Sequence, residues 1–230
     1  MSLPNPMATP SLPSSWHMIR ALGGVGVLCS LLIAVTFQQT LPIITRNKAE
    51  ALQKAVFNVL PGATARSSFR LDSEGQIQPG GGRATHGDRL VYAGYDDHGD
   101  LVGIAIEASG QGFQDVIRLL YGYSPAREAV IGMEVLESKE TPGLGDKILK
   151  DASFLANFEA LDAALTAAGT LRNPIEVVKH GRKQRPWQID GITGATISSV
   201  AVGAIIGASA EQTLPVLIGQ MDRLRQIHHE

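Results

Sequence analysis

The sequence predicts an α+β domain with a mostly antiparallel sheet and flanking helices, preceded by one N-terminal transmembrane helix. Two observations support this fold class. An uncharged apolar stretch lies near the N-terminus, and the β-rich and helical segments after it lack the regular β-α-β alternation of a doubly wound sheet. The length of 230 residues allows one good-sized domain and an additional segment. With 44% hydrophobic and 18% charged residues, the chain is not expected to be disordered.

The predicted transmembrane helix covers residues 21–44, within a stretch between Arg20 and Arg46 that contains no charged residue. About 20 apolar residues are enough to cross the roughly 30 Å hydrocarbon core of a bilayer. A cleavable signal peptide is the alternative. The nearest cleavage-like sequence, Ala-Val-Thr at 34–36, matches the small-x-small pattern poorly, which favours an anchor. The charges on the two sides, Arg20 against Arg46 and Lys48, do not decide the orientation of the helix.

Composition excludes several kinds of site. The single cysteine, Cys29, excludes an intrachain disulfide, an all-cysteine zinc site and a protein-held iron–sulfur cluster. Leu28 precedes it where a lipoprotein would have a small residue, so Cys29 is interpreted as part of the membrane helix. The net charge of −2 and the lack of an obvious basic run argue against a nucleic-acid partner, and the histidine spacings indicate no metal site. Redox chemistry would therefore need a bound organic cofactor.

The first half of the remaining chain predicts one helix and a hairpin. Residues 48–60 have apolar positions at helical spacing, and Pro61-Gly62 ends that helix. Residues 78–82 are expected to form a loop. Residues 90–95 and 101–107 are β-rich, and the acidic segment between them is expected to be a hairpin turn because it lacks the ligand pattern of a calcium loop.

The second half predicts more helices than strands. We expect strands at 129–136 and 175–179. The helices are expected at 113–120, at 153–168 with Gly169 after it, at 197–208 and at 211–227, where Pro215 would lie in the first turn.

A glycine-containing loop follows the strand at 129–136, with the sequence Glu-Thr-Pro-Gly-Leu-Gly-Asp at 140–146. Its two glycines would let backbone approach a ligand closely. It is not a P-loop, because Lys147 directly follows Asp146 and the Gly-Lys-Ser/Thr triplet is absent. By itself, this loop would more often be a tight turn than a binding site.

The segment Asp-Gly-Ile-Thr-Gly-Ala-Thr-Ile-Ser at 190–198 comes immediately before a helix rich in small residues. A helix N-terminus has unpaired N–H groups and positive dipole, which would stabilise a phosphate at Thr196. The alternative is that Thr193, Thr196 or Ser198 simply caps the helix. Physical reasoning alone favours capping.

Both segments resemble motifs of one family. Residues 190–198 resemble the D-x-x-[S/T]-G-A-[S/T]-x-[S/T] motif of the covalent FMN-binding domain, and residues 140–145 are similar to its E-T-P-G-L-G loop. Together with the N-terminal helix, nearly the whole chain resembles the G-subunit family of Rnf-type electron transport complexes. In that family, a threonine is joined by a phosphoester to FMN.

The resemblance implies a role for each matching residue. Thr196 matches the flavin-bearing threonine, and Asp190 matches the acidic residue that the FMN-transferring enzyme needs, plausibly through its metal. The residues that would shape the turn and keep Thr196 accessible are Thr193, Gly194, Ala195 and Ser198, with Thr193 where serine is more usual. The residues that would lie against the flavin are Glu140, Thr141, Gly143, Leu144 and Gly145.

The implied function is that of a redox subunit. FMN, one per chain, would relay electrons in a membrane complex that couples ferredoxin and NAD redox reactions to Na⁺ or H⁺ transport. No catalytic acid–base or nucleophile pair is expected. The implied organisation is a cytoplasmic tail at 1–20, the helix at 21–44 and a periplasmic FMN domain at 45–230, in the inner membrane of a bacterium. The implied partners are the other subunits and an FMN transferase. The alternatives are the C subunit of a Na⁺-translocating NADH:quinone reductase and a flavin-free, membrane-anchored binding or assembly module.

Overall fold

The computed structural model describes residues 15–72, 75–80 and 89–226. By its internal contacts, the chain divides into Met1–Glu50 and Ala51–Glu230. The helices expected at 21–44 and 48–60 are parts of one continuous helix, α1 (Ser15–Val59), with Pro42 inside it. The apolar part of α1 is long enough to cross a membrane, by length and composition. The tail expected at 1–20 lies outside the described residues up to residue 14.

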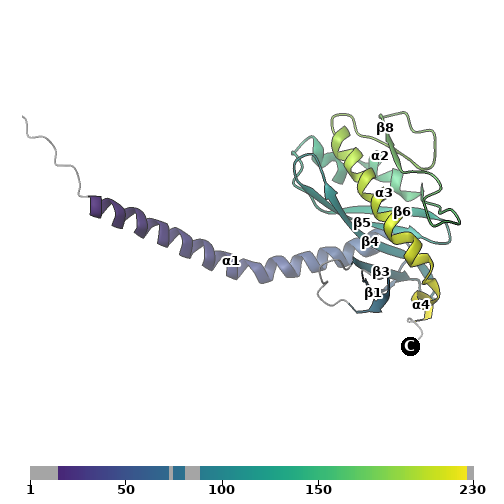
Figure 1. Ribbon diagram of the computed structural model, residues 1–230, viewed down its shortest axis with the longest axis horizontal. Helices are drawn as coiled ribbons and strands as arrows, with labels where there is room; N and C mark the ends of the chain where they lie inside the picture. Colours follow the sequence, from purple (N-terminus) through teal and green to yellow (C-terminus); the bar gives the residue numbers. More distant parts are fainter. Residues whose placement is uncertain (1–14, 73–74, 81–88, 227–230) are drawn as a thin grey trace, which may run out of the picture. The chain divides into compact units, whose positions relative to one another are not determined.

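Seven strands form an antiparallel sheet in the order β2-β1-β3-β4-β5-β6-β7 (Figure 1). The fold class predicted from the sequence is therefore confirmed. A separate two-stranded sheet pairs two short parallel strands, β8 and β9. The bounds of the strands are β1 (Ala65–Leu71), β2 (Ile77–Pro79), β3 (Arg89–Tyr95), β4 (Leu101–Gln111), β5 (Val116–Ser124), β6 (Ala129–Glu137), β7 (Leu161–Asp162), β8 (Glu176–Val178) and β9 (Gln188–Asp190).

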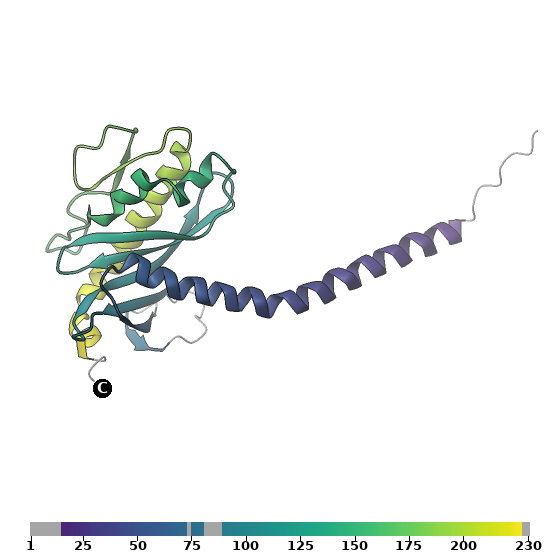
Figure 2. The same cartoon turned by 180° about the vertical axis from the view of Figure 1, so that it is seen from behind.

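The remaining helices lie in the second half of the chain. They are the 3₁₀ helices η1 (Gly145–Leu149) and η2 (Ala156–Glu159) and the α-helices α2 (Ala152–Leu155), α3 (Thr196–Ile218) and α4 (Met221–Gln226). α3 lies across one face of the large sheet (Figure 1), and the turns of α1 from residue 51 onward cover the other face (Figure 2). α3 is also long and apolar enough to cross a membrane, but it is packed as a core helix.

The helix predicted at 113–120 is wrong, because β5 begins within it. The neighbours Leu119 and Leu120 are both buried, one in the core under α3 and the other in the core under α1. Since both faces of this central strand are covered, apolar residues occur at successive positions. Their spacing then resembles that of a short amphipathic helix, which explains the wrong prediction.

The helix predicted at 153–168 is also wrong beyond Glu159. Leu161 and Asp162 form β7, which pairs with Val130 and Ala129 at the edge of β6. Leu161 is fully buried there. Pairing of the sheet edge and burial therefore override the helix propensity of this alanine-rich segment.

Near the C-terminus, the predicted break between the helices at 197–208 and 211–227 is wrong. α3 continues to Ile218, so Pro215 lies near its end and not in the first turn of a new helix. The loop expected at 78–82 is also partly wrong, because Gln78 and Pro79 belong to β2, while residues 81–82 lie outside the described residues. The hairpin of β3 and β4, the strand at β6 and the strand at β8 are confirmed.

Candidate functional site

The structure brings the two motifs together. The loop at 140–146 leads into η1, which lies beside the N-terminal end of α3. A Cβ atom placed on Gly194 would lie 3.9 Å from Lys147 Nζ and 4.0 Å from Leu144 Cδ2. Gly194 precedes Thr196 by two residues, and Leu144 is about half exposed. The candidate site is therefore a surface made by η1, its preceding loop and the start of α3.

Glu140 connects the two motifs. Its side chain is only 5% exposed, and its Oε2 accepts a hydrogen bond of 2.5 Å from the Ser198 hydroxyl. Its Oε1 accepts a hydrogen bond of 3.0 Å from the backbone N–H of Gln114. A buried carboxylate needs such donors to be tolerated. Glu140 therefore connects the loop to α3 through a buried hydrogen bond.

Glycine is needed at the two positions of the loop for different structural reasons. Gly145 is packed against Glu140, because a Cβ there would lie 2.6 Å from Glu140 Oε2 and 2.9 Å from Ser198 Oγ. Gly143 has φ of +78°, and a Cβ there would meet nothing within 4 Å. Only Gly143 therefore leaves open space on the site's surface, and its backbone conformation is one that favours glycine.

The loop also contains a carboxylate that holds its backbone. Asp146 accepts a hydrogen bond of 2.7 Å from the N–H of Gly143 and one of 2.5 Å from Lys150 Nζ. The hydrogen bond from Lys150 is the main reason why the pKa of Asp146 lies below its usual value. Thr141 is held from the other side, because its hydroxyl donates to Gln114 Oε1 at 3.0 Å. The loop is thus fixed without any ligand.

Thr196 is the first residue of α3 and is exposed. The N-cap is Ala195, and no side chain among the described residues caps the helix. The capping interpretation of Thr193, Thr196 and Ser198 is therefore wrong. The Thr196 hydroxyl makes only a long hydrogen bond of 3.5 Å to the Ile192 carbonyl.

These features fit a phosphate ester of FMN. An uncapped helix N-terminus offers backbone N–H groups and positive dipole to an anion. Thr196 is an exposed residue there, and its neighbours Gly194 and Ala195 are small. Lys147 is partly buried beside Gly194 and forms no ion pair with the residues that the structure describes. Sequence reasoning missed Lys147 as a site residue. Its position after Asp146 excludes a P-loop, but no sequence pattern connects it with residue 194.

Asp190 is the last residue of β9, and its carboxylate is bound to the segment before that strand. Oδ2 accepts a hydrogen bond of 3.0 Å from the N–H of Gly181, and Oδ1 accepts one of 3.3 Å from the N–H of Arg182. Its own backbone is fixed by the buried Asn157, whose Oδ1 accepts from the Asp190 N–H at 3.0 Å. The structure thus gives Asp190 backbone partners within its own chain.

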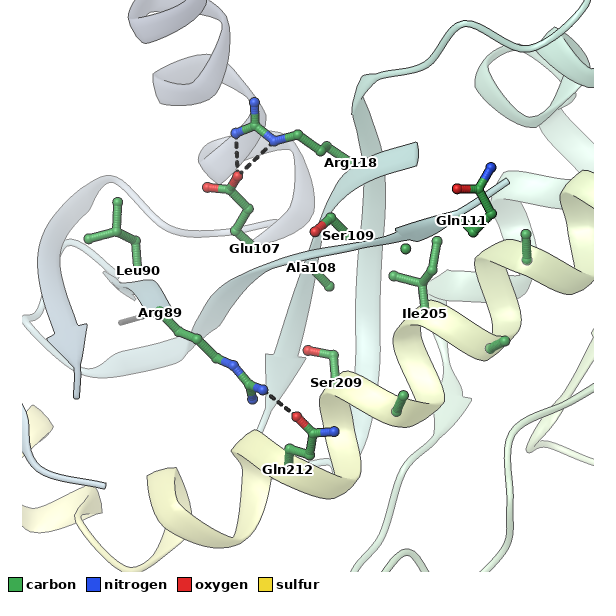
Figure 3. A pocket seen from close by; sticks show the side chains of 14 residues that line it. Arg89, Leu90, Glu107, Ala108, Ser109, Gln111, Arg118, Ile205, Ser209 and Gln212 are labelled. Carbon is green, nitrogen blue, oxygen red and sulfur yellow. Dashed lines mark hydrogen bonds and ion pairs between the residues drawn. The ribbon is translucent and has the colours of Figure 1, made fainter. Parts of the chain in front are cut away.

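A groove of about 700 Å³ lies elsewhere, between β4 and the middle of α3 (Figure 3). Its two arginines already have partners. Arg118 is paired with Glu107 and Glu137, and Arg89 donates to Thr213 and Gln212. Neither motif contributes a residue to its lining, so the groove is not part of the candidate site.

Comparisons with known proteins agree with this geometry. The model of the FMN-binding domain family matches residues 112–211, a range that includes both motifs. The chain is 30% identical over 178 residues to the G subunit of an ion-translocating oxidoreductase complex from Methanosarcina acetivorans, covering 77% of this chain and 83% of that protein. A protein with the same name from Escherichia coli K12 is 28% identical over 178 residues, covering 76% of this chain and 80% of that protein.

Two solved structures have the same fold. Shewanella oneidensis NqrC matches with a TM-score of 0.59 and 16% identity, over 79% of this chain and 99% of that one. The C subunit of the Na⁺-translocating NADH-quinone reductase from Parabacteroides distasonis matches with a TM-score of 0.55 and 19% identity, over 76% of this chain and 94% of that one. These likenesses concern the fold alone. The sequence relationship to the G subunits shows that the chain belongs to the G-subunit family of ion-translocating oxidoreductase complexes, and the family model shows that it contains an FMN-binding domain.

Proposed function

We propose that this protein is an electron-transfer subunit of a membrane-bound, ion-translocating ferredoxin:NAD oxidoreductase and that its FMN is attached covalently to Thr196. The main supporting observation is the exposed residue Thr196 at the uncapped start of α3. The names of the G-subunit relatives and the FMN-binding domain model support the redox role. FMN would supply the capacity to accept and donate electrons.

The chain's own residues would hold and position the group. The first-turn N–H groups of α3 and the Lys147 ammonium would stabilise the negative phosphate. Leu144, which is exposed next to Gly194, would pack against the flavin together with Thr141 and the open surface at Gly143. Glu140, Gly145 and Ser198 would not contact the flavin. They would hold the two motifs in fixed positions relative to each other.

Attachment is a phosphoryl-group transfer from FAD. The Thr196 Oγ forms a bond to the flavin-side phosphorus, and the P–O bond that bridges the two phosphates breaks. AMP leaves with the bonding electron pair, and the hydroxyl proton passes to a base of the transferase. No oxidation or reduction occurs in this step. The requirement on this chain is an accessible hydroxyl, which the small residues Gly194 and Ala195 provide.

Localisation and organisation complete the proposal. The apolar part of α1, at 21–44, would anchor the protein in the inner membrane with a single span. Residues 1–20 would lie in the cytoplasm, and residues 45–230 would form a periplasmic FMN domain, where an FMN transferase loads it. The other subunits of the complex would donate and accept its electrons, coupled to Na⁺ or H⁺ transport. Covalent attachment would retain the flavin where free FMN is not replenished.

The test is the intact mass of the denatured protein, produced together with an FMN transferase. Wild type should carry one added FMN phosphoryl group, and Thr196→Val should carry none because it lacks the acceptor oxygen. Thr193→Val is the matched control, since Thr193 is also exposed and lies in the preceding turn. It should be loaded like wild type. Wild-type protein without added mass or colour would instead support a flavin-free module.

A further inference from the structure

A cluster of positive charge lies in the segment between β8 and β9. Residues 179–185, here called the basic loop, have the sequence Lys-His-Gly-Arg-Lys-Gln-Arg, and five of the seven are Lys, Arg or His. All seven residues are exposed. The expectation that the chain has no basic run is therefore wrong, because the net charge of −2 concealed a local concentration. A charged, exposed loop would ordinarily repel itself and sample many conformations.

The backbone of the basic loop is nevertheless fixed at both ends. The Asp190 carboxylate accepts from the N–H groups of Gly181 and Arg182, and its Oδ2 lies 3.5 Å from His180 Nδ1. Gln188 Oε1 accepts from the N–H groups of residues 184 and 185, at 3.0 and 3.1 Å. These hydrogen bonds hold backbone groups of the loop and do not use its lysine and arginine side chains.

The side chains of the basic loop are differently engaged. Lys183 donates to Asn157 Oδ1 at 3.0 Å, and burial lowers the pKa of its ammonium group. Arg185 lies over the Trp187 ring, 5.8 Å from its centroid. Lys179 and Arg182 form no side-chain ion pair with the residues that the structure describes. Lys179 and Arg182 therefore present uncompensated positive charge to an approaching anion.

The basic loop borders the segment that contains Thr196. It leaves β8 at Val178, whose carbonyl accepts a hydrogen bond of 2.9 Å from the N–H of Gly191. Gly191 and Asp190 begin the Thr196 motif. Both views show β8 and the N-terminal end of α3 at the same end of the domain (Figures 1 and 2). A partner that reaches the Thr196 hydroxyl would therefore approach the end of the domain that carries this charge.

We infer that the basic loop is a docking site for the flavin transferase with its bound FAD. The attraction is electrostatic, between the positive side chains of the loop and the negatively charged pyrophosphate of FAD with the transferase surface around it. This inference rests on the proposed attachment of FMN to Thr196. Asp190 is then a positioning residue, because its carboxylate holds the backbone of the loop. An anionic lipid surface is the competing partner. Fixation of the loop by a residue of the Thr196 motif favours the transferase.

The test is transferase kinetics with the full-length apoprotein in phosphatidylcholine vesicles, using purified transferase, FAD and Mg²⁺. The initial rate of covalent flavin attachment is measured as fluorescence of the denatured band over a range of acceptor concentrations. Lys179→Gln/Arg182→Gln removes two charges from the basic loop. Arg223→Gln/Arg225→Gln removes two exposed charges from α4 and is the matched control.

The loop variant should raise the KM for the acceptor about tenfold at low salt and leave kcat within about twofold of wild type. The difference should shrink at about 0.5 M salt, where surface charges are screened. The control should behave like wild type. Asp190→Asn should also raise KM more than it lowers kcat, whereas a residue that contacts the transferase metal would lower kcat.

Three outcomes separate the possibilities. Equal KM values for the loop variant and the control overturn the inference while leaving attachment at Thr196 intact. The kinetics are repeated in phosphatidylglycerol vesicles, and a defect of the loop variant that appears only there assigns the loop to lipid and also overturns the inference. Absence of any attachment to wild type, with an independent acceptor loaded normally, refutes the proposed function itself.

Discussion

Gly145→Ala is the sharpest test of the arrangement that joins the two motifs. A Cβ on residue 145 would lie 2.6 Å from Glu140 Oε2, 2.9 Å from Glu140 Cβ and 2.9 Å from Ser198 Oγ. All three separations are shorter than van der Waals contact, so the buried carboxylate or the first turn of α3 must move. Overpacking of a core costs about 1–3 kcal/mol. With three short contacts, we expect a cost at the upper end of this range, about 3 kcal/mol.

Gly143→Ala is the control for this substitution, two residues earlier in the same loop. Its new Cβ would meet nothing within 4 Å, but φ at this position is +78°. The left-handed conformation costs an alanine about 1 kcal/mol. The two substitutions therefore add the same methyl group and differ by about 2 kcal/mol because only one of them meets Glu140.

The assay is thermal unfolding of the full-length apoprotein in detergent, followed by near-UV circular dichroism. This signal reports the loss of fixed packing around aromatic rings, which in the domain include the buried rings of Tyr95, Tyr121 and Tyr123. A domain of this size loses about 2–4 °C in Tm per kcal/mol. We expect losses of about 6–12 °C for Gly145→Ala and about 2–4 °C for Gly143→Ala. Equal losses would refute the claim that Glu140 is held tightly between the loop and α3.

Two further predictions concern the same network. Ser198→Ala should destabilise the domain by about 1–3 kcal/mol, because Glu140 loses a donor while buried, yet it should still be loaded with FMN in the denatured-band fluorescence assay. Asp146→Asn should lower Tm at neutral pH, because the folded-state pKa of Asp146 is depressed by Lys150 and by the N–H of Gly143. That stabilisation is present above the unfolded pKa of about 3.9 and is lost as pH falls through the lower folded pKa. The Tm difference from wild type should therefore shrink as the pH falls below the unfolded pKa, and a difference that stays constant as the solution is acidified would contradict this role of Asp146.

The parts of the fold that could be predicted from sequence are those specified by local chemistry. Pro61-Gly62 ends α1 as expected, and the acidic segment at 96–100 forms the turn between β3 and β4. The Asp96 carboxylate accepts from the N–H groups of His98 and Asp100, a turn interaction that short-range sequence specifies. Neither feature depends on a distant part of the chain.

The elements that were predicted wrongly depend on distant contacts. β5 lies between β4 and β6 and is covered on both faces, so its burial pattern carries no strand periodicity. β7 exists because the edge of β6 offers Ala129 and Val130 as pairing partners. No local window contains these partners. The alanine and leucine content of residues 153–168 favours a helix in isolation, whereas the apolar spacing of residues 113–120 resembles that of a short helix.

The candidate site also has features that local sequence indicates and features that depend on the complete fold. The family motifs identified Thr196 and the loop at 140–145 from sequence, but the resemblance implied that every residue of the loop lies against the flavin. The structure separates Glu140 and Gly145, which are buried, from Leu144 and Gly143, which are exposed. Burial depends on the complete fold, so residue order alone could not make this distinction.

The buried contact also explains why the two motifs must occur in one chain. Burial of the Glu140 carboxylate is tolerated because Ser198, 58 residues later, and the backbone N–H of Gln114 both donate to it. Leu144 and Lys147, in the segment that follows Glu140, lie beside Gly194 just before the start of α3. Each motif therefore supplies what the other lacks: a hydroxyl and a helix N-terminus from one, and a carboxylate, an apolar side chain and an ammonium group from the other. The surface that we propose for the phosphate and the flat apolar ring lies where the two motifs meet.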